Sequence, residues 1–200
     1  MPKTYIDRLI VLARQKGLLR TRDVVKEGIP RQYLKIACKR KMLERRGRGL
    51  YSVPGNLMDE NISLAEVCKI VPKGVICLLS ALSYHNLTTQ LPSEVWFAIS
   101  EKARIPKVET VSIRIFRFSE NALNSGVEIK VAHGAEIRVF SAAKTVADCF
   151  KYRNKIGLDV AIEALRDCRH KRKCTMDDLW HYAKICRVAN VMRPYLEAVV

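Results

Sequence analysis

Residues 30–54 read PRQYLKIACKRKMLERRGRGLYSVP, and they decide the fold of the N-terminal part of the chain. Pro30 can open a helix, because its missing N–H falls among the amides that have no partner in a first helical turn. We expect this helix to run to about Lys41. The basic run that follows leads into residues 50–53, whose alternation predicts a strand that stops at Pro54. The stretch therefore predicts a helix followed by a tight, basic hairpin.

Two further helix signals precede this stretch. Thr4 is placed to cap a helix with Asp7 three residues on, and Gly17 is placed to end it. Thr21 repeats the signal ahead of a short helix that Gly28 ends. A short turn then separates this helix from the one that starts at Pro30, as in a helix-turn-helix. Three helices followed by a hairpin predict a winged helix over residues 1–56.

The remainder of the chain predicts a second domain, at residues 57–200, after a polar linker at 56–61. Ser63 and Glu66 form a capping-box pattern for a helix to about Ile70, and residues 75–87 are apolar enough for a buried helix. Further helices are predicted at 141–150, 157–168, 177–188 and about 192–199.

Four strand-like runs lie between these helices, at 94–99, 112–118, 127–132 and 136–140. The last three alternate between apolar and polar residues, which favours a mostly antiparallel sheet with one covered face. The predicted fold class is therefore α+β, with an N-terminal winged helix and an α+β C-terminal domain that ends in helices.

The positive charge is concentrated in the first domain. The chain has a formal net charge of +16, and residues 1–56 hold 15 Lys and Arg against four Asp and Glu. Binding to phosphates needs such a local density of cations, so a polyanion-binding module is indicated. No run approaches 18 apolar residues and no signal peptide is indicated, so we expect a cytoplasmic protein that contacts no membrane. The seven cysteines are interpreted as core residues in a reducing compartment.

The third helix and the hairpin carry the candidate DNA-binding residues. At helical spacing Leu34, Ala37 and Cys38 share the inward face, and a cationic face with one glutamine points outward. Lysine can meet phosphates, and glutamine can pair with adenine. A Gly-Arg-Gly turn would present arginine to a minor groove. A solvated surface is the alternative in both cases. The candidates are Arg31, Gln32, Lys35, Lys39, Arg40, Arg45, Arg46 and Arg48.

Catalytic and metal-binding patterns are sparse. None of the four histidines is spaced from a possible nucleophile as in a known catalytic motif, and the sequence has no Gly-rich phosphate-binding loop. Residues 168–174 read CRHKRKC, but no C-x-x-C pair accompanies them, so a basic connection between two helices is favoured over a zinc site. The acid pairs at 59–60 and 177–178 fit a linker and a helix first turn. No catalytic residue, metal or cofactor is predicted.

Three further runs carry a resemblance to a known family. They are RGLYSVP at 48–54, PKGVICLLSALSYHNLTTQLP at 72–92 with EVW at 94–96, and FSAAKTVADCFKYRNKIG at 140–157. Together they resemble the AbiEi-family antitoxins of type IV toxin–antitoxin systems, which act in abortive infection. The resemblance implies an N-terminal winged helix that represses its own operon by binding promoter repeats. It also implies a C-terminal domain that counteracts a toxin of nucleotidyltransferase type.

By position in the family, Arg31, Gln32, Lys35 and Lys39 would lie on the recognition helix, and Arg45, Arg46 and Arg48 on the wing. The run from Ser141 to Lys155 is interpreted as fold-defining. Its expected arrangement is a cap at Ser141, packing by Val146, Cys149 and Phe150, and exposure of Lys144, Lys151, Arg153 and Lys155. Two alternatives stay open. One is a solitary regulator whose second domain senses a ligand or a protein, and the other is a nucleic-acid-processing enzyme, which would need a cluster of metal-binding acids.

Overall fold

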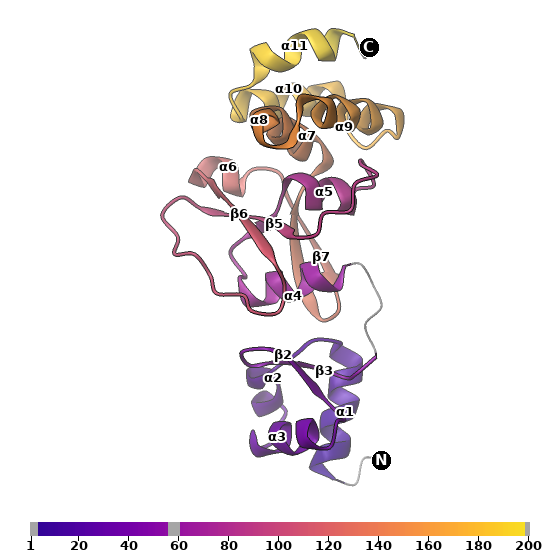
Figure 1. Ribbon diagram of the computed structural model, residues 1–200, viewed down its shortest axis with the longest axis vertical. Coiled ribbons are helices and arrows are strands. Elements are labelled where there is room, and N and C mark those ends of the chain that lie inside the picture. Colours follow the sequence, from indigo (N-terminus) through magenta and orange to yellow (C-terminus); the bar gives the residue numbers. More distant parts are fainter. Residues whose placement is uncertain (1–3, 56–60, 199–200) are drawn as a thin grey trace.

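The structure, a computed structural model, describes residues 4–55, which we call the head, and 61–198, which we call the body (Figure 1). Figure 1 shows the head at one end of an elongated molecule and the last helix at the other. All of the predicted linker except Asn61 lies outside the described residues. Within the described ranges, no helix is both long enough and apolar enough to cross a membrane.

The head contains three helices and three short strands. They are α1 (Tyr5–Lys16), β1 (Leu19–Arg20), α2 (Thr21–Lys26), α3 (Gln32–Lys39), β2 (Glu44–Gly47) and β3 (Leu50–Ser52). The predicted cap of α1 is confirmed, because the backbone N–H of Asp7 donates to the Thr4 hydroxyl over 3.2 Å. The second helix begins at Thr21 itself, because the Asp23 carboxylate accepts from the N–H of Arg20, over 2.9 Å, and so caps the residue before it.

A small apolar core holds the head together. Its strands form an antiparallel sheet in the order β1-β3-β2, and the three helices pack around buried leucines. Leu34 and Ala37 of α3 are 3% and 0% exposed, so the inward face predicted for this helix is confirmed at both positions. Leu9, Leu12 and Ala13 supply the matching face of α1. The burial of these side chains fixes which face of α3 is left to solvent.

The body contains the remaining elements. They are α4 (Ile62–Ile70), β4 (Val75–Ile76), α5 (Leu78–Tyr84), β5 (Val95–Ser100), β6 (Ile113–Phe118), α6 (Glu120–Asn124), β7 (Val127–Ala132), β8 (Ala135–Phe140), α7 (Ala142–Lys151), α8 (Arg153–Ile156), α9 (Leu158–His170), α10 (Met176–Ile185) and α11 (Ala189–Glu197). All four predicted strands are present. The helix predicted over 75–87 instead starts at Leu78, after the two-residue strand β4. The α+β fold class is confirmed.

The five-stranded body sheet is mixed, which corrects the expectation of a mostly antiparallel sheet. Its order is β6-β5-β4-β8-β7. The pairs β4–β5 and β7–β8 are antiparallel, whereas β5–β6 and β4–β8 are parallel. Alternation of apolar and polar residues indicates that one face of a sheet is buried, but it carries no information on the direction of the strands. The connection over residues 101–112 is long enough to return the chain to the same end of the sheet, which makes β5 and β6 parallel.

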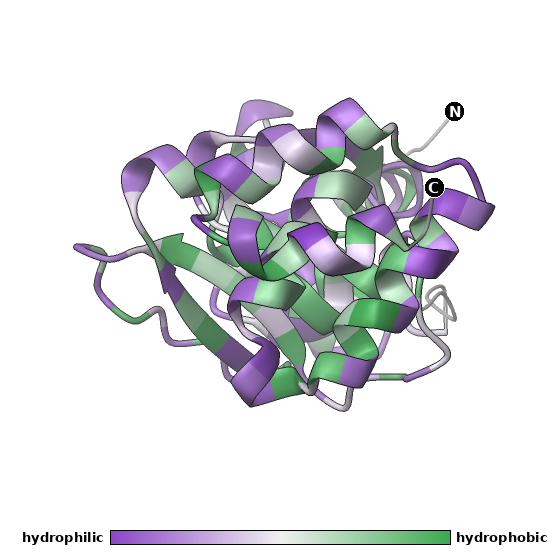
Figure 2. Cartoon of the chain, turned by 90° about the horizontal axis from the view of Figure 1, so that it is seen from above, coloured by the Kyte–Doolittle hydropathy of each residue, from purple (hydrophilic) through white to green (hydrophobic). Residues whose placement is uncertain are grey.

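The interior strand β5, which lies between β6 and β4, is buried on both faces. Val95, Phe97 and Ile99 pack on the side of α4, and Trp96 and Ala98 pack toward α7 and the C-terminal helices. Figure 1 shows this arrangement, with α4 on the head side of the sheet and α7–α11 beyond it. Seen from above in Figure 2, hydrophobic residues gather in the middle of the body and hydrophilic residues along its rim. Helices therefore cover both faces of the sheet.

The end of α1 and the turn between β7 and β8 bring the head against the body. The N–H of Leu18 donates to the carbonyl of His133 over 3.1 Å. Lys69 of α4 lies next to this contact and is 9% exposed. Its ammonium donates to the carbonyl of Leu18 in the head and, over 2.9 Å, to that of Gly134 in the body. One buried side chain therefore links both parts.

Gly134 is needed for this close approach. It has φ +66°, and a Cβ built there would lie 2.0 Å from the carbonyl oxygen of Lys16. We expect Gly134→Ala to lower the free energy of unfolding by about 1–2 kcal/mol through backbone strain, with a further loss from the displaced head. Gly28 is the matched control, because it has φ +70° and no atom within 4 Å of its added Cβ. Urea unfolding of both variants checks this, and equal losses would contradict the contact.

Candidate nucleic-acid interface

Helix α3 lies at the end of the head that is furthest from the body (Figure 1). The turn before it is set by Gly28, at φ +70°, and by Ile29, which is 2% exposed and anchors the turn in the head core. With Leu34 and Ala37 buried, the opposite face is left to solvent. The structure brings five of the candidate residues together there, and all five are exposed: Arg31, Gln32, Lys35, Lys39 and Arg40.

The four cations of this face are available to a ligand. None of Arg31, Lys35, Lys39 and Arg40 forms an ion pair with a carboxylate among the described residues. Ile36 of the same helix is half-buried, so it is less available for an apolar contact than a fully exposed residue. The α3 face therefore combines uncompensated positive charge with one amide, and that is the combination that suits phosphates and base edges.

The hairpin between β2 and β3 divides the three arginines into two groups. Arg45 and Arg48 are exposed. Arg46 is half-buried, pairs with Glu44 over 2.5 Å and donates to the Ser52 hydroxyl over 3.2 Å. Both partners belong to the same hairpin, so Arg46 braces the two strands. Arg45 and Arg48 are therefore the exposed arginines of this hairpin, and the guanidinium of Arg45 also donates to the carbonyl of Gly47 over 3.1 Å.

The same hairpin lies close to the body. A Cβ built at Gly47 would be 3.7 Å from the Thr110 hydroxyl and 3.9 Å from Ile70. Thr110 in turn donates to the Glu66 carboxylate. Glu66 is 4% exposed and accepts this long-range hydrogen bond. It does not cap α4, so the capping box predicted from its spacing with Ser63 is wrong. The position of the hairpin is thus set by the body as well as by the head.

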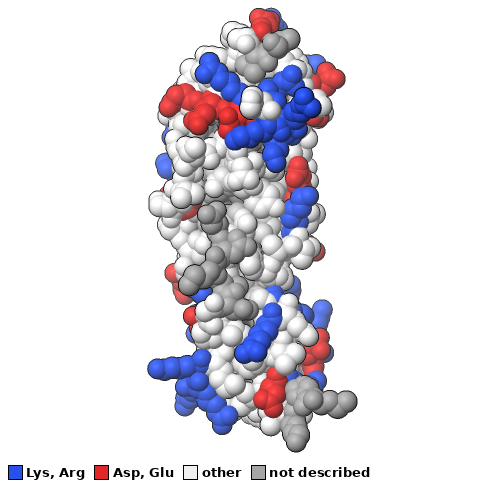
Figure 3. Space-filling view, turned by 90° about the vertical axis from the view of Figure 1, so that its right-hand side faces the viewer, with Lys and Arg blue, Asp and Glu red and all other residues white. Residues whose placement is uncertain are grey.

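A second basic surface lies at the other end of the molecule. Residues 168–174 span the last turn of α9 and most of its connection to α10. Figure 3 shows Lys and Arg side chains gathered at the body end of the molecule, with acidic side chains beside them. Lys171 pairs with Asp167 over 2.6 Å and donates to the carbonyl of Asn86 over 2.8 Å. Cys168 and Cys174 are joined in a disulfide across this connection. The disulfide differs from the reduced state expected of all seven cysteines, whereas the expected place in the core is confirmed for Cys168, which is 0% exposed.

Lys144, expected on the surface, is fully buried. Its ammonium pairs with the Asp148 carboxylate over 2.5 Å, and both side chains are 0% exposed. It also lies 4.2 Å from the ring centroid of Phe140. The thiol of Cys186 donates to the second oxygen of Asp148 over 3.2 Å. Burial raises the pKa of Asp148 and the nearby ammonium opposes this, so the pair is a structural element inside the helical layer.

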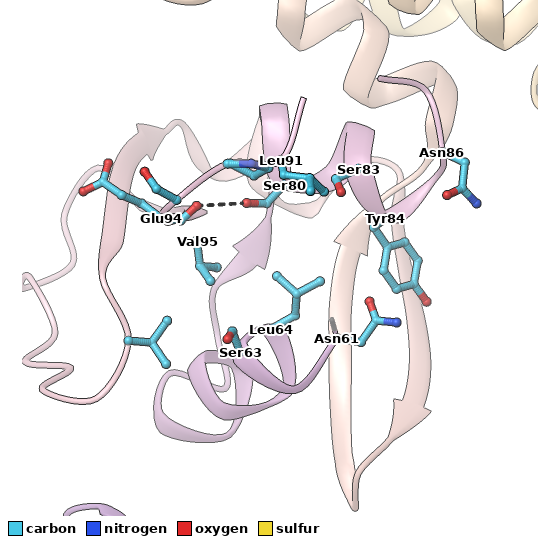
Figure 4. Close-up of a pocket in the computed structure, with 13 residues that line it drawn as sticks. Asn61, Ser63, Leu64, Ser80, Ser83, Tyr84, Asn86, Leu91, Glu94 and Val95 are labelled. Carbon is cyan, nitrogen blue, oxygen red and sulfur yellow. Dashed lines mark hydrogen bonds between the residues drawn. The ribbon is translucent and has the colours of Figure 1, made fainter. Parts of the chain in front are cut away.

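A polar pocket in the body has a volume of about 340 Å³. Figure 4 shows Ser63 and Leu64 of α4, Ser83 and Tyr84 of α5, and Glu94 before β5 around it. The Ser80 hydroxyl is already engaged, since it accepts from the N–H of Trp96 over 2.9 Å.

The hydroxyl groups of this pocket lie beside the Glu94 carboxylate, to which Ser112 donates over 3.1 Å. The ring of His85, which follows α5, is bonded to the carbonyl of Phe140 over 2.7 Å. No group of His, Cys, Asp or Glu that could hold a metal ion occurs among residues 4–55 and 61–198.

Lys69, the link between head and body, has an unusual pKa. Burial, together with Arg20, Lys16 and Arg22, lowers it to about 8, and Asp23 opposes the shift. An unfolded lysine keeps its ordinary pKa near 10.5, so between about pH 8 and 10.5 the unfolded chain binds one proton more than the folded chain. This group therefore makes the free energy of unfolding rise with pH across that window.

We expect Lys69→Met to remove that rise. Methionine keeps most of the side-chain volume but carries no titrating group. Urea unfolding of both proteins at pH 7, 8.5 and 10 gives the difference between their free energies. The free energy of unfolding of the wild type should increase relative to that of Lys69→Met as the pH rises. A constant difference would show that the pKa of Lys69 is not shifted.

Comparison with known proteins supports the resemblance seen in the sequence. Residues 7–54 match the family model described as a transcriptional regulator, the AbiEi antitoxin. The resemblance to this family is therefore confirmed over the head, and the match does not extend over the two body runs at 72–92 and 140–157. No curated protein matches the chain.

A solved structure shares the overall fold. The crystal structure of the RV2827C protein from Mycobacterium tuberculosis aligns with a TM-score of 0.61 at 12% sequence identity, over 100% of this chain and 81% of that one. At so low an identity the likeness concerns the fold alone. It extends over both the head and the body.

Proposed function

We propose that this chain, whose residues 7–54 match the AbiEi antitoxin regulators, is a DNA-binding transcriptional repressor that uses its head as a winged helix. The observation that carries the proposal is the α3 face, on which four exposed cations have no acidic partner among the described residues. An exposed, cationic second helix of a helix-turn-helix is suited to the major groove. In this proposal residues 1–56 form the DNA-binding domain and residues 57–200 the partner-binding domain.

The two groups of candidate residues have different roles in the proposal. Lys35, Lys39, Arg31 and Arg40 contact phosphates and guanine, and Gln32 reads one base pair. Arg45 and Arg48 of the hairpin add phosphate or minor-groove contacts beside the helix. Arg46 acts through the hairpin that it braces. Affinity then comes from both elements, and sequence reading comes from α3.

The hairpin assignment can be tested with Arg45→Ala/Arg48→Ala. Each lost phosphate contact removes about 0.9 from the slope of log affinity against log salt, so the slope should become shallower by about 2. Affinity should fall about 20-fold to 30-fold at 0.15 M salt for every DNA sequence. Fluorescence anisotropy with promoter and unrelated duplexes measures both quantities. If the double variant binds promoter DNA as well as the wild type, the hairpin is not a wing that contacts DNA.

The second half of the proposal is that the body counteracts a toxin of nucleotidyltransferase type and that the head represses the promoter shared with it. The family match supports this role for the head only, so the body is tested separately. Co-expression with the product of the neighbouring gene should restore growth if that product is toxic. A variant with an intact body but without the α3 cations should still restore growth while it fails to repress a promoter reporter. Loss of both functions in that variant would overturn the division between head and body.

A further inference from the structure

A cavity of about 240 Å³ lies where the head meets the body. Arg20 and Arg22, at the start of α2, line it from the head, and Lys69, Gly134 and Glu136 line it from the body. It is distinct from the α3 face, which Figure 1 shows at the far end of the head. The cavity exists only where the two parts come together, because each of them supplies one wall.

The side chains around this cavity carry an excess of positive charge. Arg20, Arg22 and Lys69 line it, and Glu136 is its one acidic lining residue among those described. The Asp23 carboxylate, which lies nearby, already accepts from the backbone N–H of Arg20. No described carboxylate lies within ion-pair distance of the Lys69 ammonium, although that side chain is 9% exposed. Asp23 acts on this ammonium through its charge but forms no ion pair with it, and a buried ammonium without a paired carboxylate is costly, so an anion placed here would be stabilised.

The electrostatics of the neighbours agree with this geometry. Burial and the charge of Arg22 lower the pKa of Arg20. The pKa of Lys69 is lowered by burial and by three cations that face it: Arg20, Lys16 and Arg22. Asp23 is the acid that opposes the shift. Crowded cations of this kind repel one another, and a bound dianion would convert that repulsion into attraction.

We propose that this junction cavity binds the phosphate group of a small molecule, held between Arg20 and Arg22 of the head and Lys69 of the body. Guanidinium groups bind phosphate oxygens through paired N–H donors, and lysine adds a compact charge. The volume equals that of about eight water molecules, which is enough for a phosphate with a small organic group. Because the ligand is held from both sides, its binding fixes the head against the body.

This fixation gives the site a regulatory consequence that rests on the proposed DNA binding. Suppose that the ligand binds the free protein and the DNA-bound protein with different affinities. Bound ligand then changes the affinity of the protein for DNA by the same factor. The binding of the phosphate itself does not depend on that function. It can be measured on the full chain in the absence of DNA, so the two proposals can fail independently.

Isothermal titration calorimetry of the full chain with inorganic phosphate, at constant ionic strength set with sodium chloride, tests the site. We expect saturable binding with one site per chain. Arg22→Gln should raise the dissociation constant about 10-fold, as expected for the loss of one charge-assisted contact. Arg193→Gln on α11 is the matched control, since it removes the same charge from an exposed position at the opposite end of the molecule. It should leave the dissociation constant unchanged.

Ribose 5-phosphate and a short DNA duplex then distinguish the possible sources of the phosphate group. Ribose 5-phosphate should compete with inorganic phosphate in the wild type and should lose this ability in Arg22→Gln. Three results would overturn the proposal. They are heats that do not saturate, equal binding by wild type and Arg22→Gln, and a defect of Arg22→Gln that appears with the DNA duplex and not with inorganic phosphate.

Discussion

Replacing Arg31, Lys35 and Lys39 together by alanine is expected to lower the affinity for promoter DNA about 100-fold at 0.15 M salt. Each phosphate contact contributes roughly fivefold at this salt concentration through the release of a counterion. All three side chains are exposed, Arg31 at the N-cap of α3 and the two lysines within the helix. None has an acidic partner among the described residues, so their removal leaves the head core intact. Alanine also favours the helical state, so α3 should persist. Circular dichroism checks that it does.

Two controls make this experiment specific. Arg166→Ala/Lys184→Ala/Arg193→Ala removes the same charge from exposed positions on α9, α10 and α11, which Figure 1 shows at the opposite end of the molecule from α3. It should change the affinity less than about threefold, because salt screens charges that are far from the bound DNA. Gln32→Ala should leave the salt dependence unchanged and weaken discrimination at one base pair. If the body variant lost as much affinity as the α3 variant, the charge of the whole chain would be responsible and not the α3 face.

The second large effect is expected inside the body, from Asp148→Ala. This change leaves the Lys144 ammonium buried without its partner, and such a loss costs about 3–5 kcal/mol. For a chain of this size each kcal/mol lowers the melting temperature by about 2–4 °C, so a fall of roughly 10 °C is expected. Thermal unfolding followed by circular dichroism measures it.

The chain supplies its own control for this prediction. Asp167 and Lys171 are also four residues apart on a helix and 2.6 Å from each other, but they are 34% and 43% exposed. Asp167→Ala should therefore cost less than about 1 kcal/mol. Lys144→Met/Asp148→Leu should recover most of the stability that Asp148→Ala loses, since an apolar pair of similar volume needs no counter-charge. Equal losses at Asp148 and Asp167 would contradict the burial of the first pair.

Local signals predicted the elements of the head well. Thr4, Gly17 and Gly28 act within one helical turn of their own position, so the sequence is sufficient to place them. The inward face of α3 follows from helical periodicity alone. The exposure of Arg31, Gln32, Lys35, Lys39 and Arg40 follows from the same periodicity, because the buried side chains of α3 leave only one other face.

The features that the sequence did not reveal depend on contacts between distant residues. The two residues of β4 are too few to show a period, and strand direction depends on where each connection returns. Lys144 was expected at the surface because lysine is rarely buried. Its spacing of four residues from Asp148 was the available signal, and it acquires its meaning only once α9 and α10 cover α7.

The contact between head and body belongs to the same class. Lys69 meets the carbonyls of Leu18 and Gly134, which lie 51 and 65 residues away in the chain. No periodic pattern connects these positions. The bracing of Arg46 within the hairpin is a similar case on a smaller scale, since its bonds to Glu44 and Ser52 were not expected from the sequence.

The salt dependence of promoter binding tests the central claim, that the α3 face binds DNA, most directly. The affinity of the full wild-type chain and of Arg31→Ala/Lys35→Ala/Lys39→Ala is measured by fluorescence anisotropy between 0.05 and 0.3 M salt, roughly the range in which phosphate contacts dominate. We predict a steep linear fall of log affinity for the wild type and a slope shallower by about 2 to 3 for the variant. Equal slopes for the two proteins would contradict the account.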